Sequence, residues 1–119
     1  MKKEIINFNY NGGEISLEVS KVPWWFEGIG LMFSRRKKAR ALIFDLKNEV
    51  KISIHSFFVF FPFVAIWLDK DKKVIDIRKV KSFKFGIPPS RKFRYLIEVP
   101  INENYDEVLK IIDGGETFK

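Results

Sequence analysis

Two stretches near the N-terminus alternate between apolar and polar residues, which is the pattern of a β-strand with one buried face. Residues 4–10 place apolar side chains at Ile6, Phe8 and Tyr10, and residues 15–19 repeat the alternation. An Asn-Gly-Gly segment lies between the two stretches. Because Asn-Gly readily supplies the positive φ angles of a tight turn, the pattern predicts that a β-hairpin opens the domain.

Further apolar stretches predict a series of strands separated by polar or proline-containing turns. We expect these strands at residues 41–46, 50–54, 57–61, 63–68, 74–78 and 93–99. Pro62 interrupts the series and indicates a break, a bulge or a sheet edge, because proline lacks the N–H that a central strand needs. Residues 69–73 predict a polar turn, and residues 85–90 predict a stiff loop.

Two short segments carry helical signals. Residues 20–27 contain Pro23, which suits a first helical turn, and two nearby glycines then stop the helix. Near the C-terminus, residues 104–112 have an apolar side, with Asn104 as the expected N-cap. The sequence therefore predicts a mainly β (α+β) fold, either a small barrel-like or a strongly bent antiparallel sheet with two short helices.

The composition indicates a single domain over residues 1–119, because 46% of the residues are hydrophobic and 13 are Phe, which is enough for one core. The sequence has no cysteine, which excludes disulfides, thiolate nucleophiles and Cys-based zinc or iron–sulfur sites. No secretory apolar segment follows Lys2 and Lys3, so we expect a cytoplasmic protein. Abundant Lys, Ile and Glu without Cys is also a feature of thermophile proteins.

Residues 52–68 are uncharged and nearly long enough to cross a membrane. A spanning helix needs about 20 mainly apolar residues, whereas this stretch is shorter and includes His55, two serines and Pro62. Its Phe, Val and Ile content is typical of buried strands. We therefore expect an internal part of the sheet here and no membrane span.

Five groups of residues have a recognisable order and spacing. They are Gly30-Leu31-Met32-Phe33-Ser34, Ala41-Leu42-Ile43-Phe44, Ile54-His55 with Phe60-Phe61-Pro62, Trp67-Leu68-Asp69 with Val74, and Leu96-Ile97-Glu98. Together they resemble the domain of unknown function 192 family, a group of small single-domain prokaryotic proteins, over residues 14–118. The resemblance implies a compact barrel-like β fold with little helix, and it implies no established reaction.

Two positions depart from the family pattern. Ser56 stands where the family usually has Met, and Val64 stands where it usually has Asp, two residues beyond Pro62. If that carboxylate contributes to a ligand site in the relatives, the site is altered in this chain.

His55 is the only histidine, and Ser53 and Ser56 lie close to it in the sequence. A serine–histidine pair would suggest nucleophilic catalysis. However, Ser56 would point to the opposite face of a strand and no orienting acid is evident, so we interpret His55 as structural. Asp69 and Asp71 lie among three lysines that oppose cation binding, which favours a polar turn over a metal site.

The remaining acidic candidates, Asp45, Asp76 and Glu98, are scattered, and the sequence brings no pair of them together for acid–base catalysis. The glycine-rich motif of phosphate-binding loops is also absent. We therefore assign no catalytic, cofactor-binding or metal-binding residue and expect no cofactor. An enzyme that uses unrecognised carboxylates stays open as an alternative.

The net charge is +7, and five cations in six consecutive positions hold most of this excess. These residues, Arg35, Arg36, Lys37, Lys38 and Arg40, form what we call the basic loop. Like charges repel one another, so we expect a solvated loop. Such a loop could bind the backbone of a nucleic acid or another polyanion, so we predict a non-enzymatic binding or accessory module with an anionic partner.

Three tryptophans offer a different candidate site. Trp24 and Trp25 precede the basic loop, and Trp67 lies in a predicted strand. Flat aromatic rings stack on bases and sugars, so these residues could form the mouth of a small-ligand or carbohydrate-binding barrel. Core packing is the simpler interpretation of the same side chains. The sequence does not decide the oligomeric state.

Overall fold

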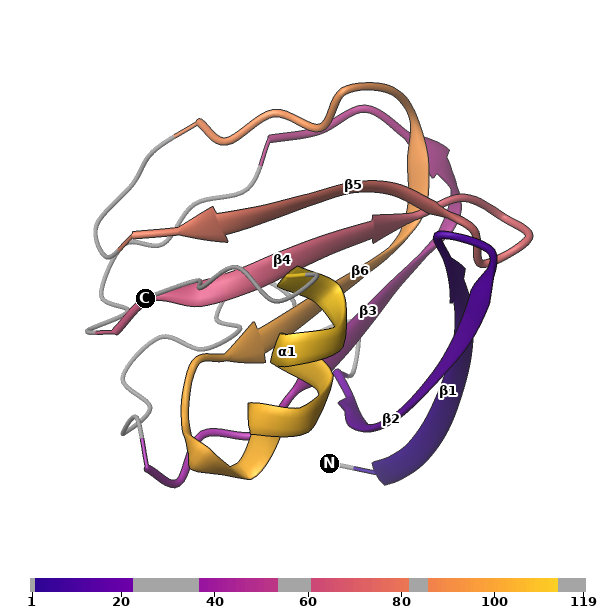
Figure 1. The fold of residues 1–119 in the computed structure, drawn as a ribbon. Coiled ribbons are helices and arrows are strands. Elements are labelled where there is room, and N and C mark those ends of the chain that lie inside the picture. The colour runs from indigo at the N-terminus through magenta and orange to yellow at the C-terminus, as the bar shows by residue number, and fades with distance from the viewer. Residues whose placement is uncertain (1, 23–36, 54–60, 82–85, 114–119) are drawn as a thin grey trace.

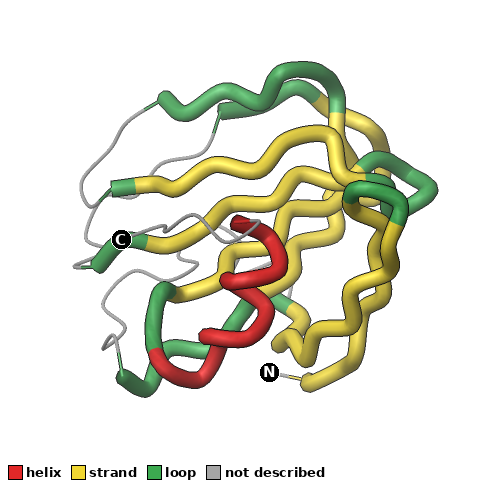
Figure 2. Tube along the Cα trace, in the orientation of Figure 1, coloured by secondary structure: helices red, strands yellow, loops and turns green. Residues whose placement is uncertain are grey.

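The computed structural model of the protein describes residues 2–22, 37–53, 61–81 and 86–113. Six strands, one 3-10 turn and one helix make up the described chain (Figures 1 and 2). They are β1 (Lys2–Tyr10), β2 (Gly13–Lys21), β3 (Leu42–Val50), β4 (Phe63–Leu68), β5 (Val74–Val80), β6 (Phe93–Pro100), η2 (Glu103–Tyr105) and α1 (Asp106–Asp113). The mainly β fold class predicted from the sequence is confirmed.

All six strands belong to one sheet in the order β1-β2-β3-β6-β4-β5. Neighbouring strands are antiparallel, except that β2 and β3 are parallel over a short contact. The sheet curls so strongly that its first and last strands approach each other, and the Asn9 amide donates to the Lys72 carbonyl at 3.3 Å. The result is a half-barrel that curves around α1 (Figure 1).

The concave face of the sheet forms the larger core. The alternating residues of the N-terminal hairpin, including Ile6, Phe8 and Leu17, point into this core as the sequence predicts. The apolar side of α1 covers the core, because Val108, Leu109 and Ile112 are buried in the same cluster. Helix α1 is therefore the lid of the half-barrel.

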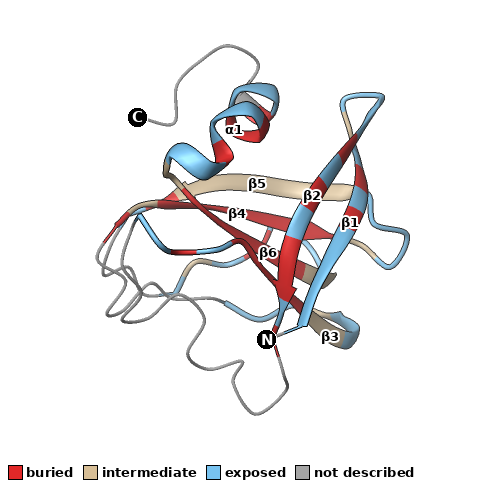
Figure 3. Cartoon of the chain, turned by 90° about the horizontal axis from the view of Figure 1, so that it is seen from below, coloured by how far each residue is buried: buried red, intermediate tan, exposed pale blue. Residues whose placement is uncertain are grey.

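The opposite face of the sheet carries a second core, here called the outer core. The largest side chains in it are Phe63 and Trp67 of β4 and Phe93 of β6, each at most 1% exposed. Because β4 contributes to both cores, it has no solvent-facing side, and Figure 3 shows this strand buried along its length. Burial on both faces explains why this part of the sequence is continuously apolar.

The turn before α1 differs from the sequence prediction. Asn102, rather than Asn104, is the capping residue: its side-chain oxygen accepts a hydrogen bond from the Asn104 amide at 3.0 Å. The chain first makes the 3-10 turn η2 and only then becomes helical at Asp106. The earlier cap works because a 3-10 turn leaves free N–H groups of its own that need a partner.

Other expectations have mixed outcomes. The hairpin, the turn at residues 69–73 and the strands at 63–68, 74–78 and 93–99 are confirmed. The strand expected at 50–54 is wrong, because β3 ends at Val50 and the next three residues are not in a strand. Most of the helix expected at 20–27 and of the strand expected at 57–61 lies outside the described residues, and Ser20 and Lys21 belong to β2. No helix among the described residues is long and apolar enough to cross a membrane.

Tyr105 joins the C-terminal segment to the middle of the chain. Its hydroxyl oxygen accepts a hydrogen bond from the backbone N–H of Ala41, at 2.6 Å, in a buried position. We expect Tyr105→Phe to lower the free energy of unfolding by about 1–3 kcal/mol, because the Ala41 N–H then stays buried without a partner. Urea denaturation followed by circular dichroism measures the change.

Tyr10→Phe is the matched control. Tyr10 packs partly buried against the same core, and its hydroxyl has no hydrogen bond within the described residues. If both variants unfold at the same urea concentration, the Tyr105 hydrogen bond does not hold the segment.

Candidate functional site

The described part of the basic loop is an exposed cationic turn. Lys37, Lys38 and Arg40 are all exposed, while Ala39 between them is buried at 4%. Arg35 and Arg36 lie outside the described residues. The alternation of one buried alanine with three exposed cations directs the positive charges to solvent.

Two asparagines of the segment before α1 hold this turn. The Asn102 side-chain amide donates to the Ala39 carbonyl at 3.2 Å, and the Asn104 side-chain amide donates to the Lys37 carbonyl at 3.4 Å. These contacts join positions more than sixty residues apart. The loop backbone is thus fixed by neutral donors, which leaves its cationic side chains available.

The loop cations differ from Arg78 and Arg94 in their charge partners. Arg94 contacts Asp45, with 3.0 Å between Nε and Oδ1, and Arg78 contacts Asp76 with 2.6 Å between Nη2 and Oδ2. Among the described residues, no carboxylate lies within ion-pair distance of the three loop cations. Cations without a carboxylate partner attract solvent anions, which an incoming polyanion would release.

Of the three candidate tryptophans, only Trp67 lies in the described chain. It is 0% exposed on β4, with the Arg78 guanidinium 5.3 Å from its ring centre. Its indole N–H is buried and has no hydrogen-bond partner among the residues that the structure describes. This is the position of a core side chain, and the ligand role of Trp24, Trp25 and Trp67 stays a prediction.

Glu98 is a residue that the sequence did not single out as buried. It is 6% exposed and pairs across the sheet with Ala65, which places it on the same face as Trp67. Arg78 pairs with Ala65 from the other side, so a carboxylate and a guanidinium flank one small residue. The sequence does not predict this burial. A glutamate that alternates with apolar residues is typical of a strand face that contacts solvent, whereas here the outer core covers that face.

Asp45 lies in an irregular part of β3. Arg94 donates to its carboxylate, and the backbone amide of Lys47, at a positive φ of 68°, donates to the same carboxylate at 2.8 Å. Partial burial acts to raise the pKa of Asp45, but these hydrogen bonds and the charges of Arg94 and Lys47 together hold the pKa below its ordinary value. The hydrogen bond to Asp45 in turn raises the pKa of Arg94.

The other polar candidates have structural positions or lie outside the description. Asp69 closes the turn between β4 and β5, accepting from the amides of Asp71 at 2.8 Å and Lys73 at 3.0 Å. Its carboxylate is therefore used by the backbone, as expected for a polar turn. His55 and Ser56 lie outside the described residues.

Comparison with known proteins gives a family likeness. The sequence profile of the DUF192 family, described as uncharacterized ACR, matches residues 6–110. A UPF0127 protein of Pyrococcus horikoshii is 36% identical over 88 residues, which cover 74% of this chain and 73% of the relative. A UPF0127 protein of Pyrococcus abyssi is 32% identical and covers 71% of both chains. These relatives come from archaea, and the thermophile character of this chain stays a prediction.

Two solved structures share the fold. A protein of unknown function from Novosphingobium aromaticivorans superposes with a TM-score of 0.67 at 14% identity, covering 89% of this chain and 78% of the other. A Sinorhizobium meliloti protein described as a candidate transcription regulator gives a TM-score of 0.70 at 17% identity, covering 89% and 84%. At these identities the likeness extends to the fold alone.

The Asp45 contacts predict an acid-dependent stability. A carboxylate with a lowered pKa in the folded state stabilises the protein above the unfolded pKa of about 3.9, and this contribution is lost as pH falls through the lowered folded pKa. We expect Asp45→Asn to be less stable than wild type at pH 7 and to lose less stability between pH 5 and pH 2. Urea midpoints across this range measure the effect.

Asp71→Asn is the control, since the Asp71 carboxylate has no ion-pair partner within the described residues. It should follow the wild-type profile. An Asp45→Asn profile parallel to wild type at every pH would show that the Arg94 contact is not formed in solution.

Proposed function

The chain belongs to the DUF192 family, and on that premise we propose that it is a non-enzymatic binding or accessory module whose basic loop contacts an anionic partner such as a nucleic acid. The family is one of uncharacterised function, so membership supplies the fold and leaves the activity to the residues of this chain. The description of the Sinorhizobium protein as a regulator carries no weight here, because only the fold is shared.

One observation carries the proposal: three exposed cations without ion-pair partners among the described residues project from a backbone that is already fixed. Lys37, Lys38 and Arg40 lie within four positions, and the Asn102 and Asn104 side chains hold the carbonyls between them. A fixed backbone reduces the entropy lost when a partner binds. Arg40 adds a guanidinium, which can grip a phosphate with two parallel hydrogen bonds.

The alternatives have less support from the described residues. For acid–base catalysis, Asp45 on β3 and Asp76 on β5 are each paired with an arginine, and β6 and β4 separate their strands. For a small-ligand barrel, the supporting observation is the unpartnered indole N–H of Trp67, whose ring is fully buried. The described cations of the basic loop, Lys37, Lys38 and Arg40, are exposed and need no rearrangement to meet a partner.

The proposal predicts salt-dependent binding of a single-stranded oligonucleotide. Changing Arg35, Arg36, Lys37, Lys38 and Arg40 together to Ser lowers the net charge from +7 to 7 − 5 = +2. We expect the plot of log affinity against log salt concentration to flatten by about three to five released counterions. Fluorescence anisotropy with labelled single-stranded RNA and DNA measures the slope.

The control variant removes the same charge elsewhere. In this variant, five exposed lysines of the hairpin and the β4–β5 turn are changed to Ser instead. They are Lys2, Lys3, Lys21, Lys70 and Lys73. If both variants lose the same slope, binding depends on net charge and not on the loop. If the wild-type protein does not bind at low salt, the loop proposal fails and the small-ligand alternative becomes the better one.

A further inference from the structure

Strand β2 has an edge that is largely unpaired within the described part of the chain. It pairs with β1 over its full length, but it meets β3 only through Ser20 and Lys21. Residues 13–19 therefore have no strand neighbour on the side away from β1 in the described ranges 2–22, 37–53, 61–81 and 86–113. In Figure 3, β2 is the strand of the hairpin nearer to α1, so this edge faces the helix.

The direction of the backbone groups can be deduced from the bonds that β2 does make. The amides of Ser20 and Val22 donate toward β3, to the carbonyls of Ala41 and Ile43. Because the direction of the N–H groups alternates along a strand, the amides of the even-numbered residues before them point the same way. These are Glu14, Ser16 and Glu18, which have no backbone partner on that side within the described chain.

A cleft of about 750 Å³ runs along this edge, between β2 and the η2–α1 segment. Its apolar lining comes from both walls and consists of Ile15, Leu17, Tyr105, Val108 and Ile111. Ile111 is 59% exposed, an unusual exposure for a large apolar side chain on the helix. The cleft therefore combines free backbone groups with apolar surface.

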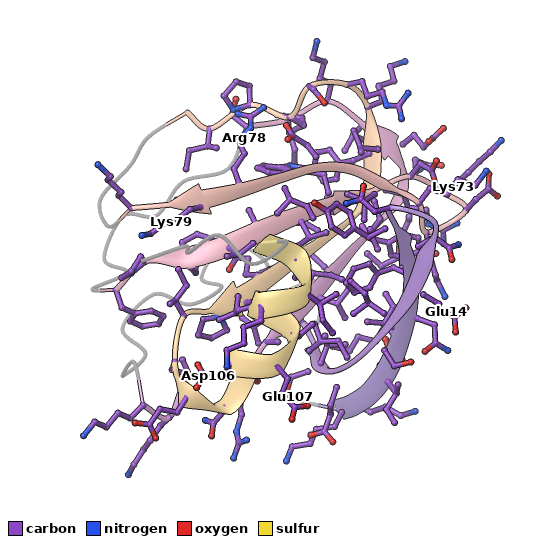
Figure 4. All side chains as sticks on the ribbon, in the orientation of Figure 1. Glu14, Lys73, Arg78, Lys79, Asp106 and Glu107 are labelled. Atoms are coloured by element: carbon purple, nitrogen blue, oxygen red, sulfur yellow. The ribbon has the colours of Figure 1, made fainter. Side chains whose placement is uncertain are left out.

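The charged lining of the cleft has the sign opposite to that of the whole protein. Its carboxylates are Glu14, Glu18, Glu103, Asp106 and Glu107, and its single cation is Arg40. In Figure 4, Glu14 lies on the hairpin wall, and Asp106 and Glu107 lie at the start of α1. All five carboxylates are exposed, and none is in an ion pair within the described residues.

We propose that this cleft binds an extended, lysine- or arginine-containing peptide segment of a partner protein, which adds to the sheet as a strand beside β2. Strand addition uses the free backbone groups for affinity and the alternating side chains for selectivity. The carboxylates select cationic side chains by charge complementarity. The cleft shares Arg40 with the basic loop, but its five carboxylates would bind a cationic partner, so this proposal does not depend on the anionic partner proposed above.

The geometry defines the peptide. In an antiparallel arrangement, one face of the added strand lies beside Glu14, Ser16 and Glu18, and the other face turns toward Ile15 and Leu17. Because Glu14 and Glu18 are four residues apart, cations at the first and fifth peptide positions lie opposite them. Apolar residues at the second and fourth positions then enter the cleft. The expected pattern is Lys-Val-Thr-Val-Lys.

A fluorescein-labelled peptide, Gly-Ser-Lys-Val-Thr-Val-Lys-Ser-Gly, tests the proposal by fluorescence anisotropy with the full chain. We expect saturable binding that weakens about 2- to 30-fold in the double variant Glu14→Gln, Glu18→Gln, because two cross-strand charge pairs are lost. The double variant Glu4→Gln, Glu49→Gln removes two exposed carboxylates outside the cleft and should bind as wild type does.

Two altered peptides separate the charge from the backbone contribution. Exchange of both lysines for glutamate should abolish binding, and N-methylation of the central threonine should weaken it at least about tenfold, because one strand hydrogen bond is lost and the methyl group obstructs pairing. Amide hydrogen exchange of Ser16 should slow when the unmodified peptide is added. The peptide-binding and hydrogen-exchange measurements both use the wild-type protein, so a folding defect of a variant cannot mimic the result.

Equal binding of the glutamate or N-methylated peptide would overturn the proposal, as would protection from exchange that appears away from β2. Sedimentation of the free protein gives a further test. If the protein is a dimer that the peptide dissociates, the occupant of the cleft is a second copy of this chain, and the proposal of a partner peptide is wrong.

Discussion

Strand β4 has no side that faces solvent: each of its residues from Phe63 to Leu68 is buried, and β5 and β6 occupy its two edges. A strand in this position requires apolar cover above and below it. On the concave face, Val64 and Ile66 lie in the core that α1 covers, and on the opposite face Phe63 and Trp67 lie in the outer core. The curl of the sheet, the position of the helix and the Phe-rich composition all serve this requirement.

The η2–α1 segment, which covers the concave face, also determines where the charged surfaces lie. Tyr105 contributes its ring to the core and its hydroxyl to the Ala41 amide, which fixes the segment before α1 against the start of β3. Asn102 and Asn104 of the same segment hold the basic loop. The acidic residues that follow form one wall of the cleft. One turn thus places a cationic and an anionic surface side by side on a protein of net charge +7.

Local features of the sequence were sufficient for much of the fold. The Asn-Gly turn and the alternation on either side of it specified the hairpin, because register within a hairpin follows from neighbouring residues. The position at which β3 ends could not be predicted from the sequence. It depends on an irregularity near Lys47, and no residue type there requires the positive φ of Lys47. The burial of Glu98 and the position of Asn102 as the cap likewise depend on neighbours that are distant in sequence.

For the functional surfaces too, features formed by neighbouring residues could be predicted and features formed by residues distant in sequence could not. The basic loop could be predicted because its cations are consecutive. The cleft could not, because Glu14 and Glu107 are more than ninety residues apart and meet only through the curl of the sheet. The free edge of β2 arises from the short contact with β3, and a long-range pairing of this kind leaves no periodic signal in either strand.

The order of the strands also determines when the sheet can form. The hairpin pairs residues that are close in sequence, so it can close within microseconds. Strand β3 instead waits for β6, since Asp45 pairs with Tyr95 fifty residues later, and β4 needs the same strand. During synthesis, the centre of the sheet therefore stays incomplete until β6 has left the ribosome. Folding is accordingly limited by a late, non-local step. Until β6 is available, β3 pairs only with β2 over two residue pairs and β4 pairs only with β5, so each strand has an open edge that can aggregate.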